Sequence, residues 1–171
     1  MLTPPGSGDA GAIFNRYAGD SEVTKYLGWP RHQTVADTQA FVAFSVAEWE
    51  RAGAGPYLIW ARDDGRLLGG TGLQIEGAGE AITGYVLAKD AWGHGYATES
   101  LTAMVDVARA IGVALLSALC HPDHRASSRV LEKCGFTRRR GWSQQIVFPN
   151  LAPGGACSVL RYELPLERGR Q

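Results

Sequence analysis

The sequence has few cysteines, no long hydrophobic run and no excess of charge of either sign. Its three cysteines, Cys120, Cys134 and Cys157, form no CxxC pair, so neither a disulfide framework nor a metal site is predicted, and unpaired thiols fit a cytoplasmic protein. No stretch approaches the roughly 20 apolar residues that span a bilayer, and the first residues lack the features of a signal peptide. Basic and acidic residues number 17 each. This balance argues against a nucleic-acid partner, which needs a basic surface.

Hydrophobic residues make up 45% of the 171 positions, which is enough to build one packed domain over 1–171. Two N-terminal helices are followed by three strands with short turns, which predicts an antiparallel meander. A later helix leads to an apolar strand, and this crossover predicts a parallel pair with the last strand of the meander. The expected elements are helices over 8–17, 34–53, 96–110 and 127–134, and strands over 57–61, 67–75, 81–88, 113–120, 136–148 and 158–164. This order predicts an α+β fold with a mixed, mostly antiparallel central sheet flanked by helices.

The second helix has clear signals at both ends. Thr34 and Asp37 are spaced as in a capping box, and Gly53 marks the C-terminal end. The buried stripe predicted from helical spacing consists of Phe41, Val42, Val46 and Trp49.

The segment from Trp92 to Glu99 carries the most chemical information. A strand ends before it, a turn containing Gly93 and Gly95 follows, and a long helix begins at Tyr96. Glycines let the backbone approach a ligand, and the free N–H groups at a helix start bind phosphate or pyrophosphate with help from the helix dipole. A plain glycine turn with ordinary capping is the alternative interpretation, and these residues alone do not separate the two.

This segment, Trp92-Gly93-His94-Gly95-Tyr96-Ala97-Thr98-Glu99, resembles the acetyl-CoA pyrophosphate loop of the GNAT acetyltransferases, especially the branch containing ribosomal-protein N-terminal acetyltransferases. Trp92 stands where the family pattern has Gln or Arg, whereas Gly95 and Ala97 match. The segment 127–136 resembles the family's Ser-x-x-x-hydrophobic-Glu-Lys-x-Gly-Phe motif, and 22–29 is a looser match. The resemblance covers nearly the whole chain. It implies the GNAT fold, with acetyl-CoA as cosubstrate and no metal.

The resemblance also implies which residues contact the cosubstrate. The oxyanion that forms during transfer is expected to be stabilised by backbone N–H groups at the end of the third meander strand. His124 replaces the family's Asn, and its imidazole can still donate one hydrogen bond to the pantetheine arm. The family's opening strand is short or missing here. The implied cosubstrate-binding residues are Val86, Leu87, Trp92, Gly93, His94, Gly95, Tyr96, Ala97, Thr98, His124 and Ser127.

Direct acetyl transfer requires a neutral amine and a proton for the leaving thiolate. By family analogy Ser127 supplies that proton, with the N-cap of the short helix as its alternative role. The family's Glu is replaced by Ile82, and Glu80 shares the face of Ile82 by strand alternation. Glu80 is therefore a candidate base acting through a water, and a solvated edge carboxylate is the alternative. Candidate acceptor-binding residues, for which core packing is the alternative, are Tyr26, Trp29, His32 and Trp142.

The function implied by the resemblance is acetyl-CoA-dependent N-acetylation of a primary amine, either a protein N-terminus or a small molecule. The alternative is a non-catalytic acyl-CoA-binding or sensing domain, which the residues Ile82 and His124 keep open. An enzyme for protein N-termini needs an open groove, whereas the loop over 149–155 can close a small-molecule pocket. A shortened first strand leaves a sheet edge exposed, and a homodimer is one way to cover it.

Overall fold

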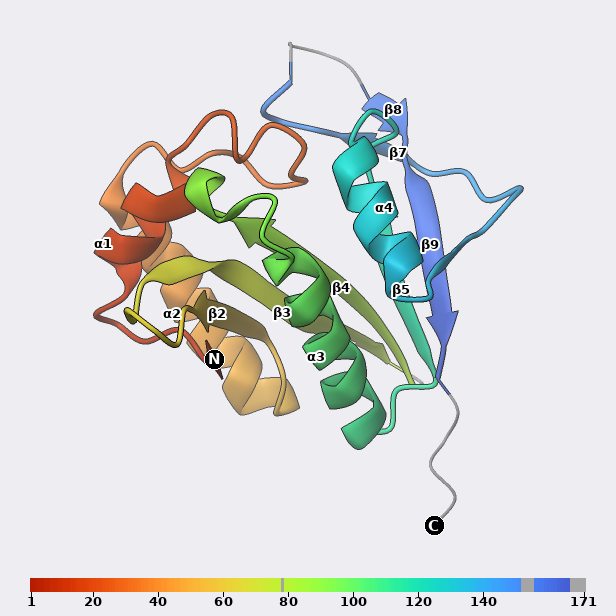
Figure 1. The fold of residues 1–171 in the computed structure, drawn as a ribbon, viewed down its shortest axis with the longest axis horizontal. Coiled ribbons are helices and arrows are strands. Elements are labelled where there is room, and N and C mark those ends of the chain that lie inside the picture. Colours follow the sequence, from red (N-terminus) through yellow and green to blue (C-terminus); the bar gives the residue numbers. More distant parts are fainter. Residues whose placement is uncertain (78, 152–155, 167–171) are drawn as a thin grey trace.

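The computed structural model describes residues 1–77, 79–151 and 156–166. Its main feature is a seven-stranded sheet in the order β1-β2-β3-β4-β5-β9-β6, accompanied by the two-stranded ribbon β7-β8 (Figure 1). Strands β4 and β5 are parallel, and the other neighbouring pairs are antiparallel, which confirms the mixed, mostly antiparallel sheet. The strands are β1 (Leu2–Thr3), β2 (Pro56–Trp60), β3 (Leu67–Gly77), β4 (Glu80–Leu87), β5 (Leu115–Cys120), β6 (Thr137–Arg138), β7 (Gln145–Val147), β8 (Ala156–Ser158) and β9 (Leu160–Pro165).

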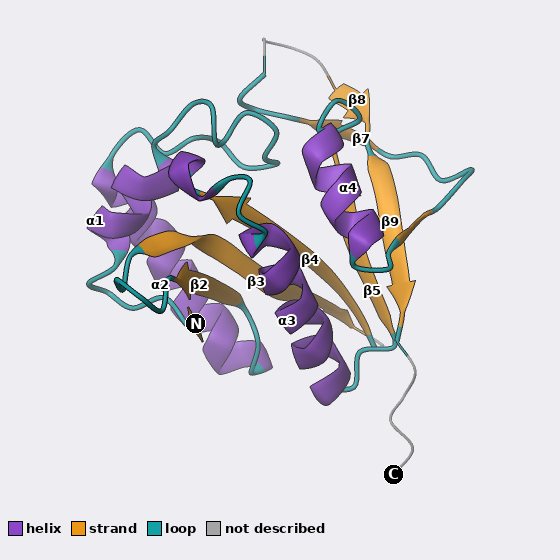
Figure 2. Cartoon of the chain, viewed as in Figure 1, coloured by secondary structure: helices purple, strands orange, loops and turns teal. Residues whose placement is uncertain are grey.

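Helices pack on both faces of this sheet, and α3 and α4 lie on the near face in Figure 2. Side chains alternate along a strand, so both faces of the sheet carry apolar residues. On one face, Leu58 of β2 packs with Ile13 and Val42 from the first two helices. On the other face, Leu73 of β3 packs with residues of α3. The helical elements are α1 (Ala10–Ile13), the π-helical η1 (Phe14–Ala18), α2 (Val35–Ala52), the 3₁₀ turn η2 (Lys89–Ala91), α3 (Tyr96–Ala110) and α4 (Arg125–Lys133).

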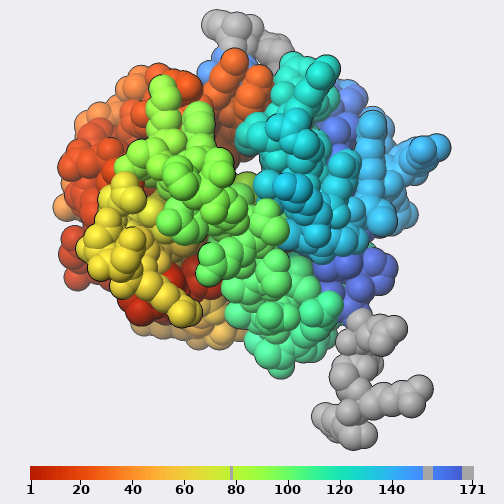
Figure 3. Space-filling model, viewed as in Figure 1, coloured from red at the N-terminus to blue at the C-terminus, as the bar shows by residue number. Residues whose placement is uncertain are grey.

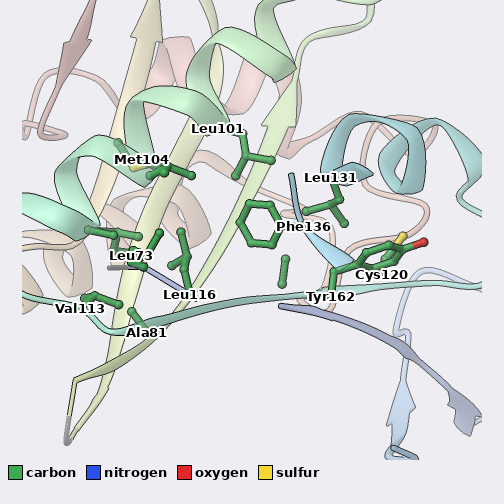
Figure 4. Packing of buried hydrophobic residues seen from close by; sticks show 14 residues of the cluster. Leu73, Ala81, Leu101, Met104, Val113, Leu116, Cys120, Leu131, Phe136 and Tyr162 are labelled. Atoms are coloured by element: carbon green, nitrogen blue, oxygen red, sulfur yellow. The ribbon is translucent and has the colours of Figure 1, made fainter. Parts of the chain in front are cut away.

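The larger core cluster joins α3 and α4 to the central strands (Figure 4). Leu101 and Met104 of α3 are fully buried, as is Leu116 of β5. Leu131 of α4 and Phe136 extend the same cluster toward β9. This packing fixes the start of α3 and the first turn of α4 relative to β4 and β5, which matters for the site described below.

The second helix forms as its signals predict, but it turns a different face inward. The Thr34 side chain accepts from the Asp37 amide, and the Asp37 carboxylate accepts from the Thr34 amide, which completes the capping box. Gly53 ends the helix in the left-handed conformation. The prediction that Val46 is buried is wrong, because the inward-facing residues are Thr38, Val42 and Ser45.

Two predicted elements have different bounds in the structure. The closing strand expected over 136–148 is split into β6 and β7, because the chain turns away through Gly141 at a φ of 74°. The short helix begins at Arg125 rather than Ser127. Residues 152–155 of the loop expected over 149–155 lie outside the described residues.

The first strand is present but has only two residues, Leu2 and Thr3, which pair with Ile59 and Leu58 of β2. It forms one edge of the main sheet. A homodimer across this edge stays a prediction. In the described ranges, no helix combines the length and the apolar character that crossing a membrane requires.

Candidate active site

The central sheet opens between β4 and β5. These parallel strands pair only from Glu80 to Ile82 on β4, after which β4 continues to Leu87 while the two strands diverge (Figure 1). The Ala88 amide donates to the Leu68 carbonyl on the β3 side. Since successive N–H groups of a strand point in opposite directions, the Val86 amide faces β3 and the Leu87 amide faces the opening. Of the two predicted residues, Leu87 is therefore the one with an available donor.

A loop rich in free amides lies next to this opening, at the start of α3. Gly93 and Gly95 have φ angles of 78° and 85°, and Gly95 is the N-cap of α3 without a side-chain capping bond. The first helical bond runs from the Glu99 amide to the Gly95 carbonyl, so the amides of residues 96–98 have no acceptor among the described residues. A Cβ added at Gly93 or Gly95 would meet no atom within 4 Å. This exposed, unoccluded row of donors is suited to a diphosphate.

Several contacts hold the loop in position beside β4. The Trp92 indole donates to the Leu87 carbonyl at 2.8 Å, which ties the loop to the end of that strand. Asp90 accepts from Arg16 at 2.7 Å and from Arg66 at 2.6 Å. Lys89 pairs with Glu22 from the N-terminal segment. In Figure 3 this green loop lies at the surface on the same face as the cyan α4.

The side chain of His94 takes no part in these anchoring contacts. Its ring stacks on Tyr96, with the centroids 5.9 Å apart. Both residues belong to the predicted cosubstrate-binding segment, and their backbone amides lie in the row just described. Trp92, at the family's Gln or Arg position, positions the loop through its side chain.

Ser127 faces the opening from α4 and is hydrogen-bonded to a residue of β4. Its Oγ lies 3.0 Å from the Tyr85 hydroxyl oxygen. The N-cap of α4 is His124, so Ser127 is the third residue of the helix and its alternative role as N-cap is wrong. Burial raises the pKa of Tyr85 to about 12, so its hydroxyl remains a donor at neutral pH. Sequence reasoning missed Tyr85, although strand alternation from Leu87 places both side chains on one face.

A cavity of about 620 Å³ lies along the divergent strands. It reaches Val86 of β4 and Cys120 of β5, and it includes Ser127. Of the predicted acceptor residues, Tyr26, Trp29 and His32 line this cavity, together with aromatic residues of α2 and the segment 146–148 that sequence reasoning missed.

Trp142 lies elsewhere. It lines a second, smaller hollow of about 340 Å³ with the arginines over 138–140. The Arg161 guanidinium lies over its ring at 5.5 Å. The structure therefore does not bring Trp142 together with the other three predicted acceptor residues.

Histidine and tyrosine rings stack at one wall of the cavity. Tyr26 stacks on His121 at 4.8 Å and on His124 at 5.0 Å between centroids. The Asp123 amide donates to Nδ1 of His121 at 3.1 Å. Burial lowers the pKa of His124, and the neighbouring His121 lowers it further. His124 is therefore neutral at pH 7 and can accept a proton.

The structure does not bring Glu80 to the site. Glu80 is the first residue of β4, at the end where that strand is still paired with β5. Seven residues separate it from Leu87, which corresponds to roughly 23 Å along a strand. Its side chain is exposed, and the alternative interpretation as an edge carboxylate describes its surroundings. Across the described residues, no group of three or more His, Cys, Asp or Glu side chains is arranged to hold a metal.

Comparisons with known proteins agree with this geometry. The model of the acetyltransferase (GNAT) domain matches residues 1–137. An uncharacterized N-acetyltransferase, YoaA of Bacillus subtilis, is 28% identical over 148 residues, which cover 85% of this chain and 82% of the relative.

Solved structures with the same fold include two enzymes bound to coenzyme A. RimL, a ribosomal L7/L12 alpha-N-protein acetyltransferase in complex with coenzyme A, superposes with a TM-score of 0.82 at 20% identity, covering 98% of this chain and 94% of that one. Spermidine N-acetyltransferase from Vibrio cholerae, in complex with coenzyme A and spermine, has a TM-score of 0.80 at 13% identity, covering 96% and 94%. The amide row before α3 fits the diphosphate of acetyl-CoA, the cosubstrate expected from the sequence. The chain belongs to the acetyltransferase (GNAT) family.

Proposed function

We propose that this protein transfers an acetyl group directly from acetyl-CoA to a primary amine. The observation that carries this proposal is the position of the amide row over 96–98, beside the Leu87 end of β4, where β4 is no longer paired with β5 and the cavity reaches Val86. A diphosphate held at the row leaves the acyl end of the cosubstrate able to reach the Leu87 amide, while an amine approaches through the cavity. A domain that only senses acyl-CoA needs the diphosphate site, but it needs neither the Leu87 amide nor a cavity for an amine.

The chemistry divides into three tasks for residues of this chain. The amine nitrogen attacks the acetyl carbonyl carbon, and the Leu87 amide donates to the oxygen that gains negative charge. One such preorganised donor lowers the barrier by about 3 kcal/mol. The carbon–sulfur bond then breaks, Ser127 Oγ–H gives its proton to the leaving thiolate, and Oγ regains a proton from the positively charged nitrogen of the tetrahedral intermediate. We assign Tyr85 as the donor in its 3.0 Å hydrogen bond with Ser127 Oγ, which leaves the Ser127 proton free for the thiolate.

Removing the Ser127 hydroxyl is expected to slow the reaction much more than it weakens coenzyme binding. Ser127→Ala should lower kcat by about 100-fold, because general acid catalysis contributes roughly that much or more. Tyr85→Phe should lower kcat by about 10-fold, since it removes only the group that orients Ser127. Steady-state kinetics with a thiol-reactive dye measure both effects. Equal kcat in Ser127→Ala and the parent protein would contradict the assignment.

We assign to His124 the removal of a proton from the acceptor's ammonium group, which frees the nitrogen lone pair for attack. Its ring lines the cavity and stacks on the Tyr26 ring, and His121 is its titratable neighbour. The Lys25 ammonium lies over the other partner of this stack, 5.0 Å from the Tyr26 ring centroid. A lowered pKa keeps the His124 imidazole neutral down to a more acidic pH. Below that pKa the imidazole is already protonated and can no longer accept a proton from the substrate.

The pH profile tests this assignment. The kcat/KM of the parent protein should fall on the acid side with a midpoint below the ordinary histidine value of about 6.5. His124→Asn, which restores the family's residue, should lose that acid limb and have a lower rate at pH 7. Ser127→Ala serves as the control, since it should lower the rate while keeping the limb. An unchanged limb in His124→Asn would show that another group accepts the proton.

The decisive test of the overall proposal is release of free coenzyme A from acetyl-CoA in the presence of amines. Amine-dependent release supports transfer, whereas tight coenzyme binding without release on any amine supports the sensing alternative.

We also propose a cytoplasmic setting, which the three unpaired cysteines support.

A further inference from the structure

The acceptor side of the cavity lacks uncompensated negative charge. Glu48 is the only Asp or Glu, and there is no Lys or Arg, among the described residues that line it. Both Glu48 oxygens are already engaged by Arg51, with Nε to Oε1 at 2.9 Å and Nη2 to Oε2 at 2.7 Å. A second or third ammonium group on an acceptor would therefore be transferred from water into the cavity with no carboxylate to pair with it, and burying an unpaired charge is unfavourable.

Aromatic rings make up much of the remaining wall. They come from η1, the segment 26–29, α2, the meander and the segment before residue 150, so they surround the space from several sides. Rings of this size bind flat apolar groups by area burial and by stacking. The rings that line the cavity belong to Tyr17, Tyr26, Trp29, Phe41, Phe44, Tyr57, Tyr85 and Phe148.

Two segments that line the cavity and are distant in sequence are joined to each other. Asn150 Nδ2 donates to the carbonyl oxygens of Thr24 and Trp29, both at 2.8 Å, and Asn150 Oδ1 accepts from the Arg31 amide at 2.7 Å. These three bonds hold the segment 24–31 against the segment that carries Phe148. The bonds fix the part of the cavity wall that these two segments form.

We propose that the acceptor is a small molecule with one primary amino group on an aromatic or similarly apolar body. This inference rests on the proposed acetyltransferase function and specifies its acceptor. The amine points toward Leu87 and His124, and the apolar body lies against the rings of Trp29 and Phe41. The same cavity disfavours polyamines because of their charge, and polar polypeptide N-termini because they present no flat apolar group to its rings.

The test compares coenzyme A release with tryptamine, phenethylamine, spermidine and an unstructured hexapeptide with a free N-terminus. We expect kcat/KM for the two aromatic amines to exceed that for spermidine and for the peptide by at least 10-fold. Tryptophol, which has the same ring and no amine, should inhibit competitively against tryptamine. A preference for spermidine or the peptide would overturn the inference and leave the acetyltransferase function standing.

Paired variants of α2 separate recognition of the apolar body from general damage. Phe41→Ala removes a cavity ring and should raise KM for tryptamine by about 10-fold with little change in kcat. Val46→Ala, on an exposed position of the same helix, should leave both constants unchanged. Equal KM values in the two variants would overturn the inference. Coenzyme A binding that persists without release on any amine would instead refute the proposed function itself.

Discussion

Replacing Gly95 with glutamate is expected to abolish coenzyme A binding, raising Kd by at least about 100-fold. The new side chain places a carboxylate in the open space where the amides of residues 96–98 meet the diphosphate. Loss of two backbone hydrogen bonds to a charged group costs about 1.5–3 kcal/mol each, which is enough for this effect without adding the charge repulsion. Isothermal titration with coenzyme A measures the change.

Gly112→Glu is a matched control for this substitution. Gly112 lies just beyond the other end of α3, also has a positive φ of 81°, and also has no atom within 4 Å of an added Cβ. The Gly112→Glu variant therefore has similar backbone strain and carries the same added charge, but at a distance from the amide row. Gly112→Glu should lose some stability and retain coenzyme binding. Equal affinities in the two variants would contradict the diphosphate site.

Replacing Gly69 with alanine is expected to destabilise the fold by about 3 kcal/mol or more. An added Cβ would lie 2.0 Å from the Val86 carbonyl oxygen and 2.9 Å from the Leu87 Cα, both backbone atoms of β4. Such a clash forces β3 and β4 apart, and overpacking of this kind costs 1–3 kcal/mol or more. Because it displaces Leu87, the folded fraction should also have a much lower kcat. Urea unfolding measures the stability.

Gly84→Ala provides the comparison on the partner strand. A Cβ there would meet no atom within 4 Å, and the residue has no left-handed backbone. Its free energy of unfolding should therefore change by less than about 0.5 kcal/mol. If Gly69→Ala were as stable as Gly84→Ala, the close approach of β3 and β4 beside Leu87 would not be a property of the protein in solution.

Features that depend on neighbouring residues were predicted well. The bounds of α3, from Tyr96 to Ala110, follow from the glycine turn before it and the apolar stripe within it. The capping box of Thr34 and Asp37 is equally local. The parallel pairing of β5 with β4 was predicted because a helical crossover permits little else.

The wrong predictions concern choices that depend on distant partners. Periodicity favours Val46 as a buried residue, but α2 instead presents Ser45, whose hydroxyl bonds to the Phe41 carbonyl at 2.8 Å and so can be buried. Strand alternation correctly puts Glu80 on one face with Ile82, yet alternation cannot show where along β4 the neighbouring strand departs. The strands part after Ile82, and the free Leu87 amide lies at the opposite end of β4 from Glu80.

The amide row before α3 was determined by the sequence itself, because two glycines and a helix start create unpaired N–H groups whatever surrounds them. The opening beside Leu87, the Tyr85–Ser127 bond and the link from Asn150 to the segment 24–31 were decided only by the tertiary structure. Their partners lie 42 to 126 positions apart in the chain. Packing of α3 and α4 against the sheet brings such distant groups together, and no local pattern encodes that packing.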